Sequence, residues 1–136
     1  MTVRRATADD LAAIAAIQEK SPEASQWDPA SYLEHQCSVA MSDGRVVGFV
    51  VVRQIAADER EILNLAVDPA ARRRGVARHL LETELRRVKS QWFLEVRASN
   101  SSAIKLYESA GFRAAGRRES YYQNPVESGI VMKFDS

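Results

Sequence analysis

The chain has 136 residues, of which 46% are hydrophobic, and this is typical of one globular domain with one core, residues 1–136. Its 19 lysines and arginines nearly balance 18 acidic residues, and the net charge of +1 argues against DNA or RNA as the main partner. No apolar run approaches the roughly 20 residues that span a bilayer. Residues 1–10 lack the apolar core of a signal peptide, and a single cysteine excludes an internal disulfide. We therefore expect a cytoplasmic protein with no membrane contact.

The first half of the chain is predicted to hold four strands and two helices. In chain order these are a strand at 2–6, a helix at 7–20, a short helix at 28–36, a hairpin across 38–54 and a strand at 60–68. Thr7 with Asp10 three residues later, and Asp28 before Pro29, are helix-start signals. Asp43–Gly44 is the turn signal of the hairpin.

The second half alternates helices and strands. We expect a helix at 69–90, a strand at 91–98, a helix at 99–112, and a closing pair of strands at 112–122 and 128–134. The long helix has a buried stripe of Val76, Leu80, Leu81, Leu85 and Val88. It joins two apolar strands, as in a right-handed βαβ crossover. The order predicts an α/β fold with a mixed, largely antiparallel sheet.

Two positions in the predicted strands depart from the apolar pattern or are open to interpretation. Cys37 stands at the start of a strand, where it is either a small buried hydrophobe or a reactive thiol, and no activating pattern surrounds it. Asn64 is the one polar residue in the apolar run 62–67, whose continuous apolarity indicates a strand covered on both faces.

The stretch VDPAARRRGVARHLLE, residues 67–82, places three arginines before a glycine near the start of the long helix. Helix N-termini attract anions, and cations there oppose the helix dipole unless an anion is bound. Gly75 permits close approach to the backbone, and Arg73 and Arg74 can add charge-assisted hydrogen bonds to a phosphate. The alternative is an amphipathic helix whose first turn is basic. The spacing is not that of a P-loop.

Two titratable side chains are candidates for acid–base catalysis. Glu95 lies inside the two-sided strand WFLEVR, where it is either a general base with a raised pKa or a structural ion pair with Arg97 or a neighbouring strand. Tyr107 stands seven residues after Asn100 on the same side of a helix. Its phenol can donate a proton to a thiolate, or it is a core tyrosine packed on Phe112.

These segments resemble the GNAT N-acetyltransferases. VDPAARRRGVARHLL is similar to the family's coenzyme signature, Arg/Gln-x-x-Gly-x-Gly/Ala after a buried strand, here with Arg72, Gly75 and Ala77. NSSAIKLYESAGF is similar to its second coenzyme segment, and LEVRASNSSAIKLYESAGF with RRESYY resembles the RimI-type N-alpha-acetyltransferases, which acetylate the N-terminus of a ribosomal protein. The resemblance covers nearly the whole chain.

The resemblance implies a GNAT-like sheet of about seven strands with helices on both faces, splayed between the fourth and fifth strands. Pantetheine would pair with β-backbone in that gap, the pyrophosphate would lie on the arginine–glycine turn, and the signature arginine would shape the turn. The residues so implied for acetyl-CoA are Leu65, Ala66, Val67, Arg72, Arg73, Arg74, Gly75, Val76, Ala77 and Asn100. No metal is expected.

In the resembling branch, the residue matching Glu95 is the general base and the residue matching Tyr107 is the general acid on the coenzyme sulfur. Direct transfer without a covalent enzyme intermediate is implied. Near neutral pH, an α-amine with a pKa of about 8 is easier to deprotonate than a lysine with a pKa of about 10.4.

The acceptor site is expected around Trp27, with Tyr121 and Tyr122 on the other side, although each of these aromatic residues could instead serve packing. The chain departs from the branch at Glu127-Ser128-Gly129, where Glu-Asp-Ala is usual, and this puts the peptide specificity in question.

The sequence therefore predicts a protein N-alpha-acetyltransferase, a monomer or weak dimer that acts on a protein or peptide N-terminus such as that of a ribosomal protein. Two alternatives stay open. One is an acetyltransferase for a small amine or lysine, and the other is a non-catalytic module that binds coenzyme or nucleic acid through the basic turn.

Overall fold

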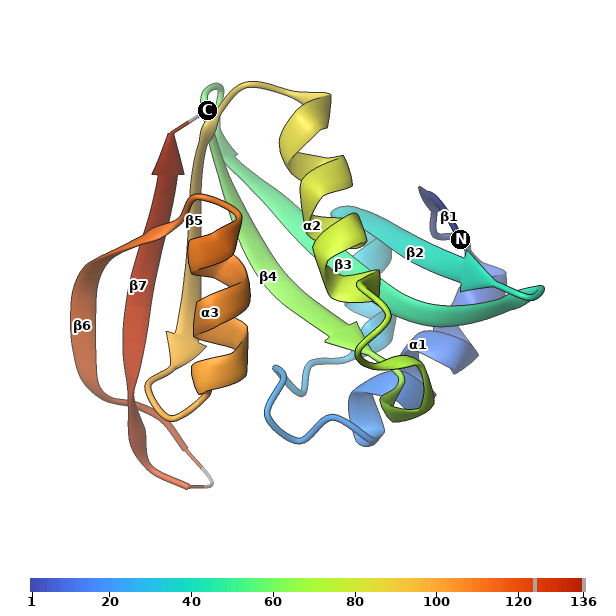
Figure 1. The fold of residues 1–136 in the computed structure, drawn as a ribbon, viewed down its shortest axis with the longest axis horizontal. Helices are drawn as coiled ribbons and strands as arrows, with labels where there is room; N and C mark the ends of the chain where they lie inside the picture. The colour runs from blue at the N-terminus through green and yellow to red at the C-terminus, as the bar shows by residue number, and fades with distance from the viewer. Residues whose placement is uncertain (124, 136) are drawn as a thin grey trace.

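The computed structural model describes residues 1–123 and 125–135 (Figure 1). The strands in this part of the chain are β1 (Thr2–Arg5), β2 (Gln36–Ser42), β3 (Arg45–Ala56), β4 (Glu59–Val67), β5 (Gln91–Arg97), β6 (Arg113–Tyr122) and β7 (Glu127–Asp135). The α-helices are α1 (Leu11–Glu19), α2 (Val76–Arg87) and α3 (Ser101–Ser109), and 3-10 turns cover Ala8–Asp10, Pro29–Glu34 and Pro69–Ala71.

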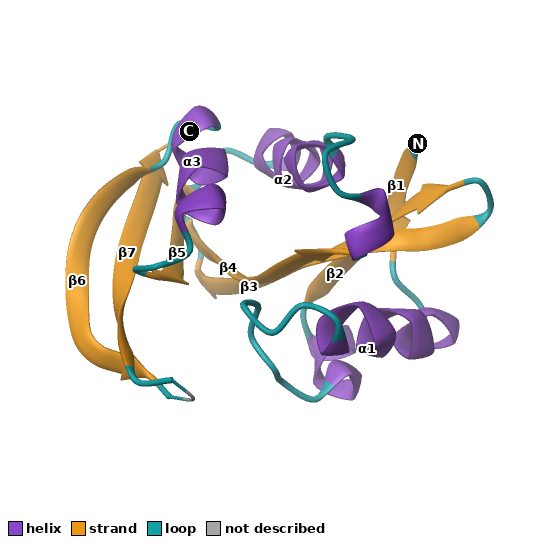
Figure 2. Cartoon of the chain, turned by 60° about the horizontal axis from the view of Figure 1, so that its bottom comes forward, coloured by secondary structure: helices purple, strands orange, loops and turns teal. Residues whose placement is uncertain are grey.

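The strands form one seven-stranded sheet in the order β1-β2-β3-β4-β5-β7-β6. β4 and β5 run parallel, and the other neighbouring pairs run antiparallel. Figure 2 shows α1 on one face of the sheet and α2 and α3 on the other. This confirms the predicted mixed, mostly antiparallel sheet with helices on both faces.

Each face of the sheet has its own apolar core. The core beneath α2 and α3 includes Leu80, Leu81, Trp92 and Leu94. The core beneath α1 includes Ile14 and Ile17, together with strand residues such as Phe49 and Val51. Cys37 belongs to this second core, and burial raises the pKa of its thiol to about 12. Cys37 is therefore a small buried hydrophobe.

The long helix is shorter than predicted at both ends. Asp68 accepts a hydrogen bond from the Ala70 N–H and closes a 3-10 turn, after which Arg72 is extended and Arg73 and Gly75 have φ values of +66° and +76°. Left-handed residues cannot continue a right-handed helix. The prediction of a helix over 69–90 was therefore wrong at its ends, because α2 spans Val76–Arg87.

The two helices predicted near the N-terminus also differ from the prediction. In the segment predicted as a helix over 7–20, a 3-10 turn at Ala8–Asp10 precedes α1. The segment predicted as a helix over 28–36 is a 3-10 helix, although the Asp28 carboxylate accepts from the Ala30 N–H as its capping role requires. The hairpin turn is as predicted, with positive φ at both Asp43 and Gly44.

The sheet splits between β4 and β5. Their pairing covers only Glu59–Ile62 with Gln91–Leu94. On the other side of β4, Val51 pairs with Asn64 and Val52 with Ile62, so Leu63 is an extra, bulged residue where the pairing with β5 ends. Because a bulge bends its strand, the rest of β4 diverges from β5, as the resemblance implied, and leaves backbone groups on that edge for a ligand.

Candidate active site

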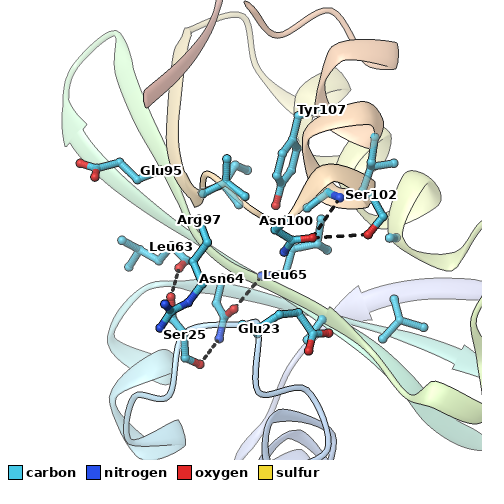
Figure 3. A pocket seen from close by; sticks show the side chains of 18 of the residues that line it. Glu23, Ser25, Leu63, Asn64, Leu65, Glu95, Arg97, Asn100, Ser102 and Tyr107 are labelled. Atoms are coloured by element: carbon cyan, nitrogen blue, oxygen red, sulfur yellow. Dashed lines mark hydrogen bonds between the residues drawn. The ribbon is translucent and has the colours of Figure 1, made fainter. Parts of the chain in front are cut away.

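The divergence of β4 and β5 opens a cleft of about 1020 Å³ (Figure 3). Its walls come from β4, β5, the turn before α2, the first turns of α3, residues 22–27, and the end of β6. The predicted site residues that line it are Trp27, Leu65, Ala66, Val67, Arg72, Arg73, Gly75, Val76, Ala77, Glu95, Asn100, Tyr107, Tyr121 and Tyr122. The remaining predicted residue, Arg74, is exposed and is not part of the lining.

The turn before α2 is open toward the cleft. A Cβ built on Gly75 meets no atom within 4 Å, so the backbone there is accessible, and its φ of +76° favours glycine. The first hydrogen bond of the helix runs from the His79 N–H to the Gly75 carbonyl (2.9 Å). The N–H groups before His79 are the ones that a helix start leaves for an anion. No acidic residue stands in the first turn.

The Arg72 side chain points back to the loop at 21–27. Its Nη2 lies 2.9 Å from Glu23 Oε1 and 3.3 Å from Ser21 Oγ, and its Nε lies 3.4 Å from the Val67 carbonyl. Arg72 therefore joins the end of β4 to this loop, which agrees with a role in shaping the turn.

A buried polar network that the sequence analysis did not assign holds the same loop against β4. Asn64 Nδ2 donates to the Ser25 carbonyl (2.9 Å) and to Tyr32 Oη (3.0 Å). Gln18 Oε1 accepts from Tyr32 Oη and Asn64 Nδ2, and Gln18 Nε2 reaches the Trp27 carbonyl (2.5 Å). The interruption of the apolar run by Asn64 was the one sequence signal for this network.

Asn100 begins α3. Its Oδ1 accepts from the Ala103 N–H (3.3 Å) and from Ser102 Oγ (3.4 Å). The side-chain oxygen thus caps the helix, and the amide nitrogen is the atom left for a ligand in the cleft.

Tyr107 is buried in the core and also borders the cleft. Its ring packs edge-to-face on Phe112 at 5.8 Å between ring centroids. Figure 3 shows the side chain directed toward the gap beside Asn100. Burial raises the pKa of the Tyr107 hydroxyl above its ordinary value, so this group keeps its proton at neutral pH.

Glu95 lies on the opposite face of β5. Along this strand Leu94 and Val96 point into the core beneath α2 and α3, while Glu95 points away from it. Glu95 Oε1 lies 3.3 Å from Arg118 Nε, and Oε2 is buried without a hydrogen-bond partner among the described residues. Burial raises the pKa of Glu95, and Arg118 opposes that rise.

The alternative ion pair between Glu95 and Arg97 is wrong. Arg97 bonds Glu127 at 3.2 Å, and its guanidinium stacks over the Tyr122 ring at 4.7 Å. Glu95 instead reaches across β7 to Arg118 on β6. Glu95 and Arg97 share a face of β5, but the Glu95 carboxylate pairs with Arg118 of β6, and the Arg97 guanidinium pairs with Glu127 of β7.

The aromatic residues predicted for the acceptor site stand at the rim on the Glu95 side. Trp27 and Tyr121 are 47% and 46% exposed. Tyr121 and Tyr122 pack edge-to-face at 5.0 Å, and Arg118 lies over the Tyr121 ring at 5.1 Å. The left-handed Ser120 (φ +52°) bends β6 immediately before the two tyrosines.

The sequence matches the acetyltransferase (GNAT) family over residues 6–112. The chain belongs to the GNAT acetyltransferase family. It is 37% identical to the [ribosomal protein bS18]-alanine N-acetyltransferase of Salmonella typhimurium, with 96% of this chain and 95% of the relative covered. It is 32% identical to the N-alpha-acetyltransferase RimI of Mycobacterium tuberculosis, with 81% and 76% covered.

The fold of this acetyltransferase matches that of solved relatives. The crystal structure of the ribosomal-protein-S18-alanine N-acetyltransferase from Escherichia coli superimposes with a TM-score of 0.85 at 31% identity, covering 98% of this chain and 92% of that one. GNAT enzymes use acetyl-CoA. The accessible turn at Gly75, the basic residues beside it and the unpaired edge of β4 fit a long, anionic cosubstrate. No helix in the described part of the chain is long and apolar enough to cross a membrane.

Proposed function

We propose that this acetyltransferase transfers the acetyl group of acetyl-CoA to the N-terminal alanine of the ribosomal protein bS18. The observation that carries the proposal is the placement of Glu95 and Tyr107 on opposite sides of the sheet, beside the gap between β4 and β5. Glu95 projects from one face of β5, and Tyr107 of α3 lies on the other. A base on one face and an acid on the other suit direct transfer between two substrates that meet in the gap. The similarity over nearly the full chain to bS18-alanine acetyltransferases supports the choice of acceptor.

Acetyl-CoA supplies the thioester that the amine attacks. The turn from Arg73 to Ala77 would hold its pyrophosphate on backbone N–H groups, with Arg73 beside them. Residues Leu65 to Val67 offer backbone groups along the β4 edge that no longer pairs with β5. The Asn100 amide nitrogen would add one more contact.

Glu95 would remove a proton from the acceptor amine. Its Oε2 lacks a hydrogen-bond partner among the described residues, and its raised pKa strengthens it as a base. The α-amine has an ordinary pKa of about 8, whereas a lysine at about 10.4 is more demanding. A carboxylate base therefore favours an N-terminal acceptor over lysine.

Two further kinds of group would assist the breaking of the thioester: backbone N–H groups of β4 and the Tyr107 hydroxyl. Backbone N–H groups along the diverging part of β4 would face the oxygen on which charge develops. Tyr107, like any tyrosine, is protonated at neutral pH, and it would donate that proton to the departing sulfur. A thiol has an ordinary pKa of about 8.5, below that of a phenol, so this proton transfer is uphill and depends on a donor that is placed close to the sulfur as the thiolate forms.

Acetyl transfer to a panel of acceptors tests the proposal. The panel contains a peptide copying the start of bS18, the same peptide with a blocked N-terminus and an internal lysine, and small amines. We expect acetylation of the free N-terminal alanine, located by mass spectrometry. Acetylation of the blocked lysine peptide or of a small amine, with none at the free N-terminus, would overturn the proposal in favour of the alternative acceptor classes.

A further inference from the structure

Gly129 occupies a central position on the Glu95 side of the sheet. It lies on β7, where it pairs with Arg97 of β5 on one side and Arg118 of β6 on the other, and it is buried. These two arginines carry the cation–aromatic contacts to Tyr122 and Tyr121. Gly129 is therefore the backbone position beneath the aromatic rim of the proposed acceptor site.

Three groups of the site fill the space where a side chain at 129 would stand. A Cβ built on Gly129 lies 3.2 Å from Tyr122 Cε2, 3.3 Å from Tyr121 Cδ2 and 3.3 Å from Glu95 Oε2. These contacts are closer than ordinary van der Waals separation, so even a methyl group would have to displace the rings or the carboxylate. The backbone of Gly129 is not left-handed, so the space above it is the constraint.

We infer that Gly129 is a positioning residue for the acceptor: its missing side chain lets Tyr121, Tyr122 and the Glu95 carboxylate converge on the sheet, and this sets the depth of the acceptor groove. The inference rests on the proposed function. A methyl group at 129 would require the tyrosine rings or the Glu95 carboxylate, all of which line the cleft, to shift by a few tenths of an ångström. The groove would become shallower, and acceptors with a large first side chain would be affected more than those beginning with alanine or glycine.

The neighbouring strand supplies a matched control. Gly116 lies on β6, and a Cβ built there has one neighbour, Val131 Cβ, at 3.9 Å, an ordinary contact. Gly116 does not line the cleft. Gly116→Ala and Gly129→Ala thus make the same chemical change in two neighbouring strands, and only the second meets the site.

The test compares wild type, Gly129→Ala and Gly116→Ala. Peptide affinity is measured by calorimetry, KM is measured for peptides that differ only in the first residue (Gly, Ala, Leu or Phe), and acetyl-CoA affinity is measured separately. We expect Gly129→Ala to raise the KM and Kd of the Leu and Phe peptides about tenfold more than those of the Gly peptide. Acetyl-CoA affinity should stay unchanged, and Gly116→Ala should behave as wild type.

A second variant keeps the test decisive if Gly129→Ala is unstable. Tyr121→Ala removes one of the rings that the methyl group meets, so Gly129→Ala should perturb peptide selectivity less in that background. Equal selectivity of Gly129→Ala and wild type for every first residue would overturn the inference, as would identical effects of the two glycine variants. If wild-type protein acetylates no peptide N-terminus, the proposed function fails, and that failure is visible before any variant is compared.

Discussion

Three influences act on the pKa of Glu95. Burial of the carboxyl is the largest and raises the pKa, the nearby Arg118 guanidinium lowers it, and the nearby Glu61 carboxylate, the smallest influence, raises it. Arg118 is 58% exposed, so solvent screens its charge, whereas Glu95 is only 15% exposed. The result is a carboxylate that is more basic than an ordinary surface glutamate.

Replacing Glu95 by glutamine should lower kcat, because the amide keeps the shape of the side chain but cannot accept the proton. A loss of about 10²- to 10⁴-fold is the usual size for a general base. Affinity for acetyl-CoA should be unaffected. Steady-state kinetics and calorimetry measure the two quantities, and an unchanged kcat would show that Glu95 is not the base.

Replacing Arg118 by glutamine should move the acid limb of the pH profile to higher pH. A base works when deprotonated, so kcat/KM falls as the pH drops through the pKa of Glu95. Removing the cation removes the influence that lowers this pKa, so the fall should begin at higher pH. Arg117→Gln is the control, because Arg117 pairs with Glu119. Coincident acid limbs for wild type and Arg118→Gln would contradict the assignment.

At the scale of elements, the turn before α2 serves both the helix and the cleft. The left-handed residues Arg73 and Gly75 end the extended segment that follows the 3-10 turn. The start of α2 then lines the cleft. Arg72 connects this turn to the loop at 21–27 through Glu23 and Ser21. One short segment therefore contacts both the proposed coenzyme site and the loop beside the acceptor site.

The neighbouring arginines of this turn should differ in their effect on acetyl-CoA. Arg73 lines the cleft and Arg74 does not. Arg73→Ala should weaken acetyl-CoA binding about tenfold, the size of one charge-assisted hydrogen bond, and Arg74→Ala should weaken it much less. Calorimetric titration with acetyl-CoA at two salt concentrations measures both. Equal affinities of wild type and Arg73→Ala would place Arg73 among the solvated surface residues.

At the scale of the whole molecule, α1 is tied to the edge of the sheet through one carboxylate. Asp10 accepts two hydrogen bonds from Arg4 on β1 (2.8 and 2.9 Å) and one from the Thr7 N–H (2.8 Å). The Arg4 guanidinium is the main reason that the pKa of Asp10 falls from 3.8 to about 2. The carboxylate is buried, so these bonds support the packing of α1 on its core.

Asp10→Asn should destabilise the protein above pH 4 and make little difference at pH 2. The folded-state pKa of Asp10 is lowered, so its contribution is complete above the unfolded value of 3.8 and is lost as the pH falls toward about 2. We expect a loss of about 1–2 kcal/mol in the free energy of unfolding at pH 7. Urea titrations at pH 7 and pH 2 measure it, and equal losses at both would contradict the linkage.

Sequence periodicity and turn chemistry predicted the order of elements well, because those signals act between near neighbours. Asp43–Gly44 marked the hairpin, and the apolar run at 62–67 marked a strand covered on both faces. The long helix was predicted to be longer than it is. The basic segment before it has no periodic signal that distinguishes a helix from the left-handed turn at Arg73 and Gly75.

By itself, then, the sequence determined the fold class, the family and many, though not all, of the residues that line the cleft, because each of these depends on a local pattern. Tertiary structure alone decided which groups meet across strands. It paired Glu95 with Arg118, joined Asn64 to Gln18 and Tyr32, and left Gly129 beneath the two tyrosines. Such contacts join residues far apart in the chain, and their distances depend on strand register and on the bulge in β4, which no single stretch of sequence encodes.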